Sequence, residues 1–219
     1  MTEKEIFVNY LKHNLENFFF TLPVINWDEI YPLFLKIKAD LLTDIFAKYP
    51  QPSKYPEFNS LQKNSRLLIA ISLDAGVEAL FLYRLSRVIY LEFGDKTQLL
   101  PYLANLMRCK TGIEIYYSTD ITPGINLQHG SGIIIGPRYR IGKDFIIHQG
   151  VTLGQQHLYS PSEIITVGDN VVIYAGAKIL GNISIGNNVQ VGANAVVTKN
   201  LASNAIYAGV PAKKIKDLS

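Results

Sequence analysis

Cysteine is almost absent from this chain of 219 residues, and the single Cys109 excludes a framework of internal disulfide bonds. Charge of one sign is also scarce, because the net charge is only +3 and no run of Lys and Arg exceeds a pair, which argues against nucleic acid as a partner. Long apolar runs are missing as well, so we expect no membrane span. The chain begins MTEKEIFVNY, with acidic residues rather than a secretory signal. We therefore expect a soluble cytoplasmic protein.

Glycine is scarce in the first half of the chain, where only Gly76 and Gly94 of the 16 glycines precede residue 110. In this half, apolar residues recur three and four positions apart, which is the spacing of amphipathic helices. The pattern predicts helices around 3–20 and 27–48, a proline-rich loop at 50–56, and a helix pair over 65–94 with buried positions at Leu80, Leu82, Leu85 and Val88. We assign residues 1–110 to a helical domain.

From residue 111 onward the sequence repeats every six residues, with an aliphatic residue that glycine often follows. Such a hexad supplies one short strand and one turn, and three hexads close a triangular coil with the aliphatic side chains inside. A β-sandwich would instead show strands of period two at spacings of 8–12 residues. The sequence therefore predicts a parallel β-helix over 111–219 whose coils form as a stack. Its inward positions are Ile135, Ile141, Ile147, Leu153, Val167, Ile173, Ile179, Ile185, Val191 and Val197.

The repeat breaks once, between Leu153 and Val167. The two residues are fourteen apart, eight more than one hexad, so we expect residues 155–162 to leave the solenoid as a loop. Loops expelled from a rigid scaffold often carry function, although a tolerated surface insertion is the alternative interpretation.

His129 lies six residues before Ile135, where the repeat predicts an inward aliphatic side chain. A buried imidazole needs a polar partner, so a structural histidine is one interpretation. The other is a general base, because histidine transfers protons near neutral pH. Glu114, fifteen residues upstream, is predicted to lie near His129 on the neighbouring coil and to orient its ring. Asp120 is nine residues upstream, so we expect it on another side of the triangle.

Several runs of residues resemble the serine acetyltransferases. They are GIEI at 112–115, LQHGSGIIIG at 127–136, QGVTLG at 149–154, AGAKILGNISIG at 175–186, VGANAVV at 191–197 and AIYAGVPAKKI at 205–215, with a weaker likeness in GVEALFLYR at 76–84. The resemblance spans about residues 66–215. It implies an α+β protein with a left-handed parallel β-helix that transfers acetyl from acetyl-CoA to the hydroxyl of serine. It also implies that His129 is the base and that Glu114 stands for the family's acidic partner, usually aspartate.

The resemblance further implies where acetyl-CoA, the expected co-substrate, would bind. Its pantetheine arm would lie in a groove between neighbouring subunits, against small residues that permit close approach of the backbone. A main-chain amide in that groove would stabilise the tetrahedral oxyanion. The candidates for CoA binding are Gly154, Ala175 and Ala193, and for its phosphates Lys199, Lys213 and Lys214, for which a solvated surface is the alternative. No metal is expected.

Two departures from the family concern the acceptor. Gln128 stands where the family has an aspartate before the histidine, and Glu163, Ile164 and Ile165 stand where it has Arg-His-Pro. Both missing groups are associated with the charged amino-acid substrate, so acetylation of a sugar is an alternative, with His157 in the loop as base. A third interpretation is a non-catalytic or zinc-binding solenoid with His129, His148 and His157, although the close H-x4-H pair of γ-class carbonic anhydrases is missing.

The resemblance also implies how the chain assembles. We expect a trimer, or a dimer of trimers joined through the helical domains, that acts on a small-molecule hydroxyl acceptor. Members of the family dock into cysteine synthase through a C-terminal tail that ends in isoleucine. Here the chain ends at Ser219, and the seven residues after Ala212 span at most about 25 Å. We therefore expect no complex with cysteine synthase.

Overall fold

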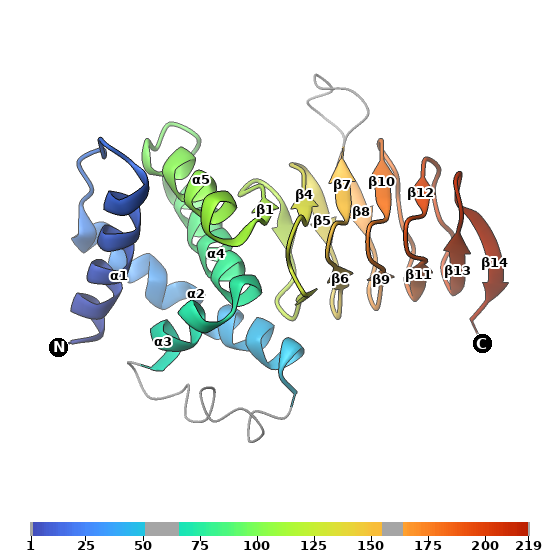
Figure 1. Ribbon diagram of the computed structural model, residues 1–219, viewed down its shortest axis with the longest axis horizontal. Helices are drawn as coiled ribbons and strands as arrows, with labels where there is room; N and C mark the ends of the chain where they lie inside the picture. The colour runs from blue at the N-terminus through green and yellow to red at the C-terminus, as the bar shows by residue number, and fades with distance from the viewer. Residues whose placement is uncertain (1, 51–65, 155–163, 219) are drawn as a thin grey trace.

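A computed structural model describes residues 2–50, 66–154 and 164–218 of the chain. In these residues, helices fill the N-terminal half and short strands fill the C-terminal half (Figure 1). The predicted helices are confirmed within a few residues, and a further one closes the helical region. The helices are α1 (Glu3–Phe18), α2 (Trp27–Lys48), α3 (Arg66–Leu73), α4 (Ala75–Phe93) and α5 (Leu99–Thr111).

The helix boundaries follow from local capping chemistry. Thr2 and Glu5 form a capping box at the start of α1, and the side chains of Asn26 and Asp74 accept backbone N–H bonds at the starts of α2 and α4. Gly112 adopts a left-handed conformation (φ 67°) and ends α5. The apolar spacing correctly places Leu80, Leu82 and Leu85 in the core, and Val88 is partly buried against it.

The strands wind into a solenoid with three sheets. Each of the strands β1 to β7 pairs in parallel with the strand three further along the chain, whereas β9, β10 and β11 pair with the strand two further along. The strand orders are β1-β4-β7-β10-β12, β2-β5-β8 and β14-β13-β11-β9-β6-β3, in which only β14 is antiparallel. The strands are β1 (Glu114–Ile115), β2 (Asp120–Ile121), β3 (Asn126–Gln128), β4 (Ile134–Ile135), β5 (Tyr139–Ile141), β6 (Ile146–His148), β7 (Thr152–Gly154), β8 (Ile165–Val167), β9 (Val172–Ile173), β10 (Lys178–Leu180), β11 (Val189–Val191), β12 (Val196–Val197), β13 (Ala205–Ala208) and β14 (Lys213–Asp217).

The strand register shows how many hexads each coil contains. Ile135 pairs with Leu153, which stands three hexads further along the chain. Leu153 pairs with Ile179, so this coil is longer than three hexads by the eight residues that the sequence shows between Leu153 and Val167. The loop itself lies outside the described residues. The first coil is also longer than three hexads, because Leu127 pairs with Ile147 and not with Phe145.

The interior of the solenoid consists of the predicted aliphatic positions, all ten of which are buried. One corner carries a ladder in which the backbone N–H groups of Lys143 and Asp169 donate to side-chain oxygens of Asp169 and Asn187 on the next coil, at 2.8 and 2.9 Å. Gly142 and Gly168 lie under these side chains, and a Cβ on either glycine would collide with them. Glycine therefore follows the aliphatic residue at this corner because the coils stack closely.

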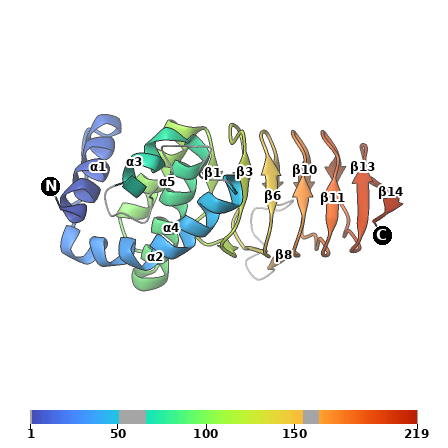
Figure 2. The ribbon, with the colours of Figure 1, turned by 90° about the horizontal axis from the view of Figure 1, so that it is seen from below.

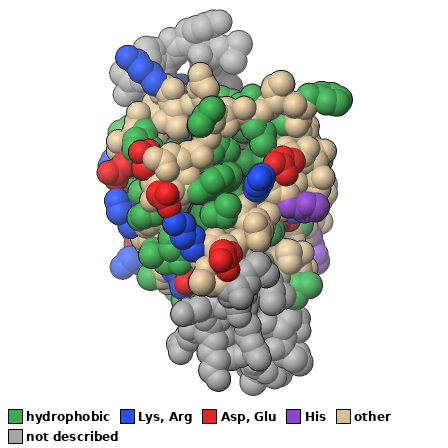
Figure 3. Space-filling view, turned by 90° about the vertical axis from the view of Figure 1, so that its left-hand side faces the viewer, with side chains coloured by type: hydrophobic (Ala, Val, Ile, Leu, Met, Phe, Trp, Pro, Cys, Tyr) green, Lys and Arg blue, Asp and Glu red, His purple; other side chains and the backbone are tan. Residues whose placement is uncertain are grey.

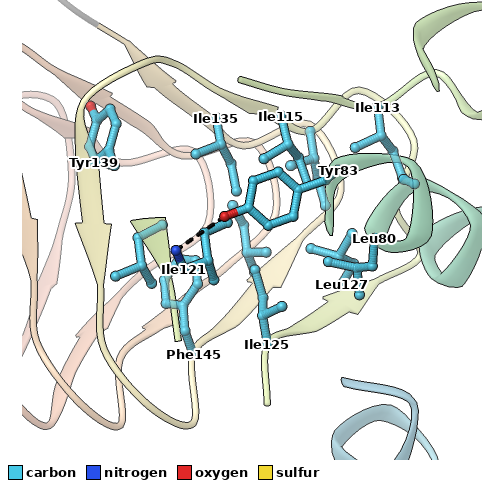
Figure 4. Close-up of a cluster of buried hydrophobic side chains, with 14 of the residues drawn as sticks. Leu80, Tyr83, Ile113, Ile115, Ile121, Ile125, Leu127, Ile135, Tyr139 and Phe145 are labelled. Atoms are coloured by element: carbon cyan, nitrogen blue, oxygen red, sulfur yellow. Dashed lines mark hydrogen bonds between the residues drawn. The ribbon is translucent and has the colours of Figure 1, made fainter. Parts of the chain in front are cut away.

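The helices cover one end of the solenoid (Figures 1 and 2). Tyr83 of α4 reaches the first coil, where its hydroxyl donates to the carbonyl of Thr119 (2.9 Å) and accepts from the N–H of Ile121 (3.2 Å; Figure 4). Beside it, Arg84 forms a buried two-contact ion pair with Asp44 of α2 at 2.9 and 3.0 Å. This junction fixes α2 and α4 against the coil that carries the candidate site.

The outer surface of the helical region carries exposed apolar side chains, among them Phe18, Leu35, Leu91 and Phe93. Figure 3 shows hydrophobic side chains gathered between charged ones on the end of the molecule opposite the last coil. In the part of the chain that the structure describes, none of the helices has the length and apolarity to cross a membrane.

Candidate active site

His129 lies at the corner where the chain passes from β3 to β4. Leu127 and Ile135 are both fully buried and are eight residues apart, so two residues more than a hexad separate them. His129 is exposed, with a left-handed backbone (φ 61°), and the prediction that it points inward is wrong. Counting back six residues from Ile135 crosses this insertion, which moves His129 from the interior to the surface.

The corner rests on the helical region and on the first coil. A Cβ built on Gly130 would lie 2.8 Å from Cδ1 of Ile113 and 3.8 Å from Cα of Gly76, at the start of α4. Gly130 also has a left-handed backbone (φ 74°), so a side chain here meets both strain and collision. This contact holds the backbone next to His129 in one position.

His148 lies beside His129 on the following coil, because Gln128 pairs with His148 in the register of β3 and β6. Its ring packs against Tyr174 of the next coil, with centroids 5.2 Å apart. Partial burial and the nearby charge of His129 lower the pKa of His148. The corner thus carries two imidazoles that interact electrostatically.

Glu114 lies in β1, at the start of the coil that ends with β3 and His129. It follows Ile113, whose side chain lies against Gly130, and the predicted proximity of Glu114 to the ring of His129 stays a prediction. Its side chain is 26% exposed, and its Oε2 lies 3.5 Å from Nη1 of Arg108. Asp120 belongs to a different sheet and pairs with Arg87 at 3.7 Å, which confirms that it lies on another side of the triangle.

The residues predicted to contact the acceptor are described only in part. Gln128 lies at the end of β3, where its Nε2 donates to Oδ1 of Asn126 at 3.0 Å. His157 lies outside the described residues. The side chain before His129 is therefore an uncharged amide held by a second amide.

The candidate residues for CoA lie at two corners of one subunit. Ala175 and Ala193 follow His129 up the same corner, where the N–H of Asn194 donates to the carbonyl of Ala175 at 2.9 Å. Gly154 lies at the opposite edge of the sheet β1-β4-β7-β10-β12, where its carbonyl accepts from the hydroxyl of Tyr139 at 3.2 Å. One subunit does not bring these three residues together.

The three candidate lysines are also dispersed. Lys199 lines a surface hollow of about 410 Å³ together with Gly181 and Asn200, near the corner of Gly154. Lys213 and Lys214 lie on the exposed strand β14 at the end of the solenoid, where Lys214 forms an ion pair with Asp217. These lysines do not form a single phosphate site within one subunit.

Two cations near the site were not singled out from the sequence. Nζ of Lys178 donates to the carbonyl of Gly150 (2.6 Å) and to Oγ1 of Thr152 (3.0 Å), which ties β10 to the corner after His148. The alternation of side chains along the strand places Lys178 on the outer face, so the sequence pattern could have indicated this residue. Lys48 of α2 lies near Gly76, and no local pattern indicates this proximity. Among residues 2–50, 66–154 and 164–218, no group of three or more His, Cys, Asp or Glu side chains is placed to hold a metal ion.

The stacked hexads and the exposed corner histidine define a class of protein. Residues 165–199 match the family model described as "Bacterial transferase hexapeptide (six repeats)". The fold agrees with a crystal structure of Neisseria gonorrhoeae serine acetyltransferase, with a TM-score of 0.77, 26% identity, and coverage of 100% of this chain and 81% of that chain. A serine acetyltransferase in complex with CoA gives a TM-score of 0.69 at 30% identity, over 86% of this chain and 74% of that chain.

Sequence comparison identifies the family within this class. The serine acetyltransferase of Staphylococcus xylosus is 38% identical over 149 residues, which cover 68% of this chain and 68% of that protein. The enzyme of Synechococcus elongatus is also 38% identical, over 64% of this chain, and the matched part spans 57% of that relative's length. The chain belongs to the serine acetyltransferase family, a family of acyltransferases.

Proposed function

We propose that this chain transfers the acetyl group of acetyl-CoA to the hydroxyl of serine, on a left-handed β-helix and with His129 as general base. The observation that carries the proposal is the exposed position of His129 on the corner that also presents Ala175 and Ala193. The small side chains of this corner leave room for a narrow chain such as pantetheine. The relative solved with CoA supports acetyl-CoA as the donor.

The reaction needs a base, an orienting acid and an oxyanion donor. His129 takes the proton of the acceptor hydroxyl while its oxygen attacks the thioester carbon. A main-chain N–H stabilises the resulting oxyanion. The carbon–sulfur bond then breaks, and the proton passes from His129 to the departing thiolate. Glu114 orients the imidazole and stabilises its positive charge. The carboxylate of Glu114 is itself held by an ion pair, in which its Oε2 lies 3.5 Å from Nη1 of Arg108.

The complete site requires more than one subunit. Gly154 and Lys199 lie at one corner of the solenoid and Ala175 and Ala193 at another. In a trimer, the first corner of one subunit meets the second corner of its neighbour, and CoA binds in the groove between them. The dispersion of the candidate residues within one chain supports this arrangement.

A sugar acceptor is the second candidate. It is favoured by the uncharged pair of Gln128 and Asn126 beside His129, which suits a neutral hydroxyl compound better than an ammonium group. In that case His157, in the loop, is the base.

The deciding experiment measures release of the CoA thiol with serine, homoserine and a panel of sugars. We expect serine to be the fastest acceptor. His129→Ala should lower kcat by about two to four orders of magnitude and leave the KM for acetyl-CoA unchanged. His13→Ala, at an exposed position on α1, is the matched control. A faster sugar, combined with loss of activity in His157→Ala but not in His129→Ala, would replace this proposal by the second candidate.

A further inference from the structure

The last turn of α2 lies against the strand that leads to His129. Nδ2 of Asn126 in β3 donates to the carbonyl of Ala47 at 3.2 Å. Both ribbon views show this end of the helix approaching the first coils (Figures 1 and 2). The next residue, Lys48, ends the helix with a side chain that is only 12% exposed.

Lys48 and Asp74 form an ion pair in which the two partners are unequally satisfied. Nζ of Lys48 lies 2.8 Å from both carboxylate oxygens of Asp74. Asp74 also accepts from the hydroxyl of Tyr49 at 2.6 Å and from the N–H of Val77 at 2.9 Å. These four bonds fill the capacity of a carboxylate, whereas an ammonium has three N–H donors. Within the described residues, the ammonium of Lys48 also lies 5.7 Å from the centroid of the Tyr49 ring, and its third N–H remains for a further hydrogen-bond acceptor.

A continuous set of contacts joins this ammonium to the His129 corner. A Cβ built on Gly76 would lie 3.0 Å from Nζ of Lys48 and 3.4 Å from Cβ of Leu127. In turn, a Cβ built on Gly130 would lie 3.8 Å from Cα of Gly76. Because neither glycine has a side chain, the cation lies close behind the residue that follows His129. The carboxylate of serine is only two carbons from its hydroxyl, so an anchor for it must lie close to the base.

We infer that Lys48 binds the carboxylate of the amino-acid acceptor. The inference rests on the proposed acetylation of serine and identifies a specificity-determining residue for it. Just before the hexad at Val167 the sequence has Glu163 and Ile164, neither of which is a cation. The helical region supplies a cation close to the corner, held in place by Asp74.

The test compares serine with ethanolamine, which keeps the hydroxyl and the amine but lacks the carboxylate. Lys48→Met should raise the KM for serine about ten- to a hundredfold, the loss expected for a charge-assisted hydrogen bond. Its kcat should stay within about threefold, and kcat/KM for ethanolamine should not change. Lys38→Met is the matched control, because Lys38 lies on the same helix and pairs with Glu3 at 2.6 Å, away from the corner.

A second variant separates binding from folding. Lys48→Met leaves Asp74 with one partner fewer, whereas Lys48→Met with Asp74→Asn removes both charges and keeps a good helix cap. Both variants should lose the preference for serine over ethanolamine. If that preference is the same as in the wild type, Lys48 is not the anchor and the serine reaction itself stands. A wild-type enzyme that acetylates a sugar and not serine would overturn the proposed function and this inference together.

Discussion

The junction between the helical region and the solenoid gives the sharpest prediction about stability. Arg84 joins α4 to Asp44 of α2 and, through Nη1, to the carbonyl of Ile121 in the first coil at 2.5 Å. Asp44 also accepts the N–H of Gly124 at 2.8 Å. Burial alone would lower the pKa of Arg84, but the hydrogen bond and the charge of Asp44 raise it, so the guanidinium stays charged. Arg84→Met would remove this cation and leave a fully buried carboxylate without it.

The expected loss follows from that burial. Breaking a buried ion pair by removing one partner costs about 3–5 kcal/mol, because the remaining charge is uncompensated. Asp44→Asn should also destabilise the protein, because it leaves the guanidinium unpaired. The double variant removes both charges, so its loss should be smaller than the sum of the two single losses by about 1–3 kcal/mol.

Urea unfolding at a fixed protein concentration measures these losses. Fluorescence reports on the helical region, because Trp27 at the start of α2 is the only tryptophan. Lys36→Met is the control, since Lys36 of α2 pairs with Glu92 of α4 at 3.0 Å on the surface, where the two side chains are 56% and 49% exposed. It should cost about 1 kcal/mol or less. If Arg84→Met loses no more stability than Lys36→Met, or if the single losses simply add, the buried pair does not hold the two parts together.

Three further predictions concern the site, acid stability and assembly. Glu114→Gln should lower kcat by about tenfold, which is less than the loss in His129→Ala. The glutamine keeps a hydrogen-bonding side chain and removes only the charge that stabilises the imidazolium. A loss equal to or larger than that of His129→Ala would make Glu114 more than an orienting group. Burial raises the pKa of Asp74, but the hydrogen bonds from Lys48 and Tyr49 and the charge of Lys48 outweigh it and lower this pKa. The contribution of Asp74 to stability is therefore present above the usual carboxyl pKa of about 3.9 and is lost as the pH falls through the lowered pKa. Asp74→Asn should therefore flatten the loss of unfolding free energy below about pH 4 in acid titrations, and an unchanged profile would contradict this. Sedimentation should show a trimer or a dimer of trimers, and a 24.5 kDa monomer at micromolar concentration would contradict the intersubunit site.

The sequence by itself determined the architecture of both halves. Helical spacing placed α1, α2 and α4 within a few residues, because an amphipathic helix must repeat its apolar face every three or four positions. The hexad phase placed the ten inward aliphatic residues, because each coil can bury its apolar face only against the next coil. These features are periodic, and a period is visible within any short stretch of the chain.

Only the tertiary structure decided how the site is put together. Two extra residues stand between Leu127 and Ile135, near His129. The aliphatic residues after them keep the six-residue spacing, so the sequence alone does not show the insertion, whereas the pairing of Leu127 with Ile147 does. Lys48 is about eighty residues from His129 in the sequence, and the packing of α2 and Gly76 brings its ammonium toward Gly130, the residue after His129. A periodic pattern fixes which face of each element is buried, whereas the contacts between distant elements depend on how those faces pack against one another.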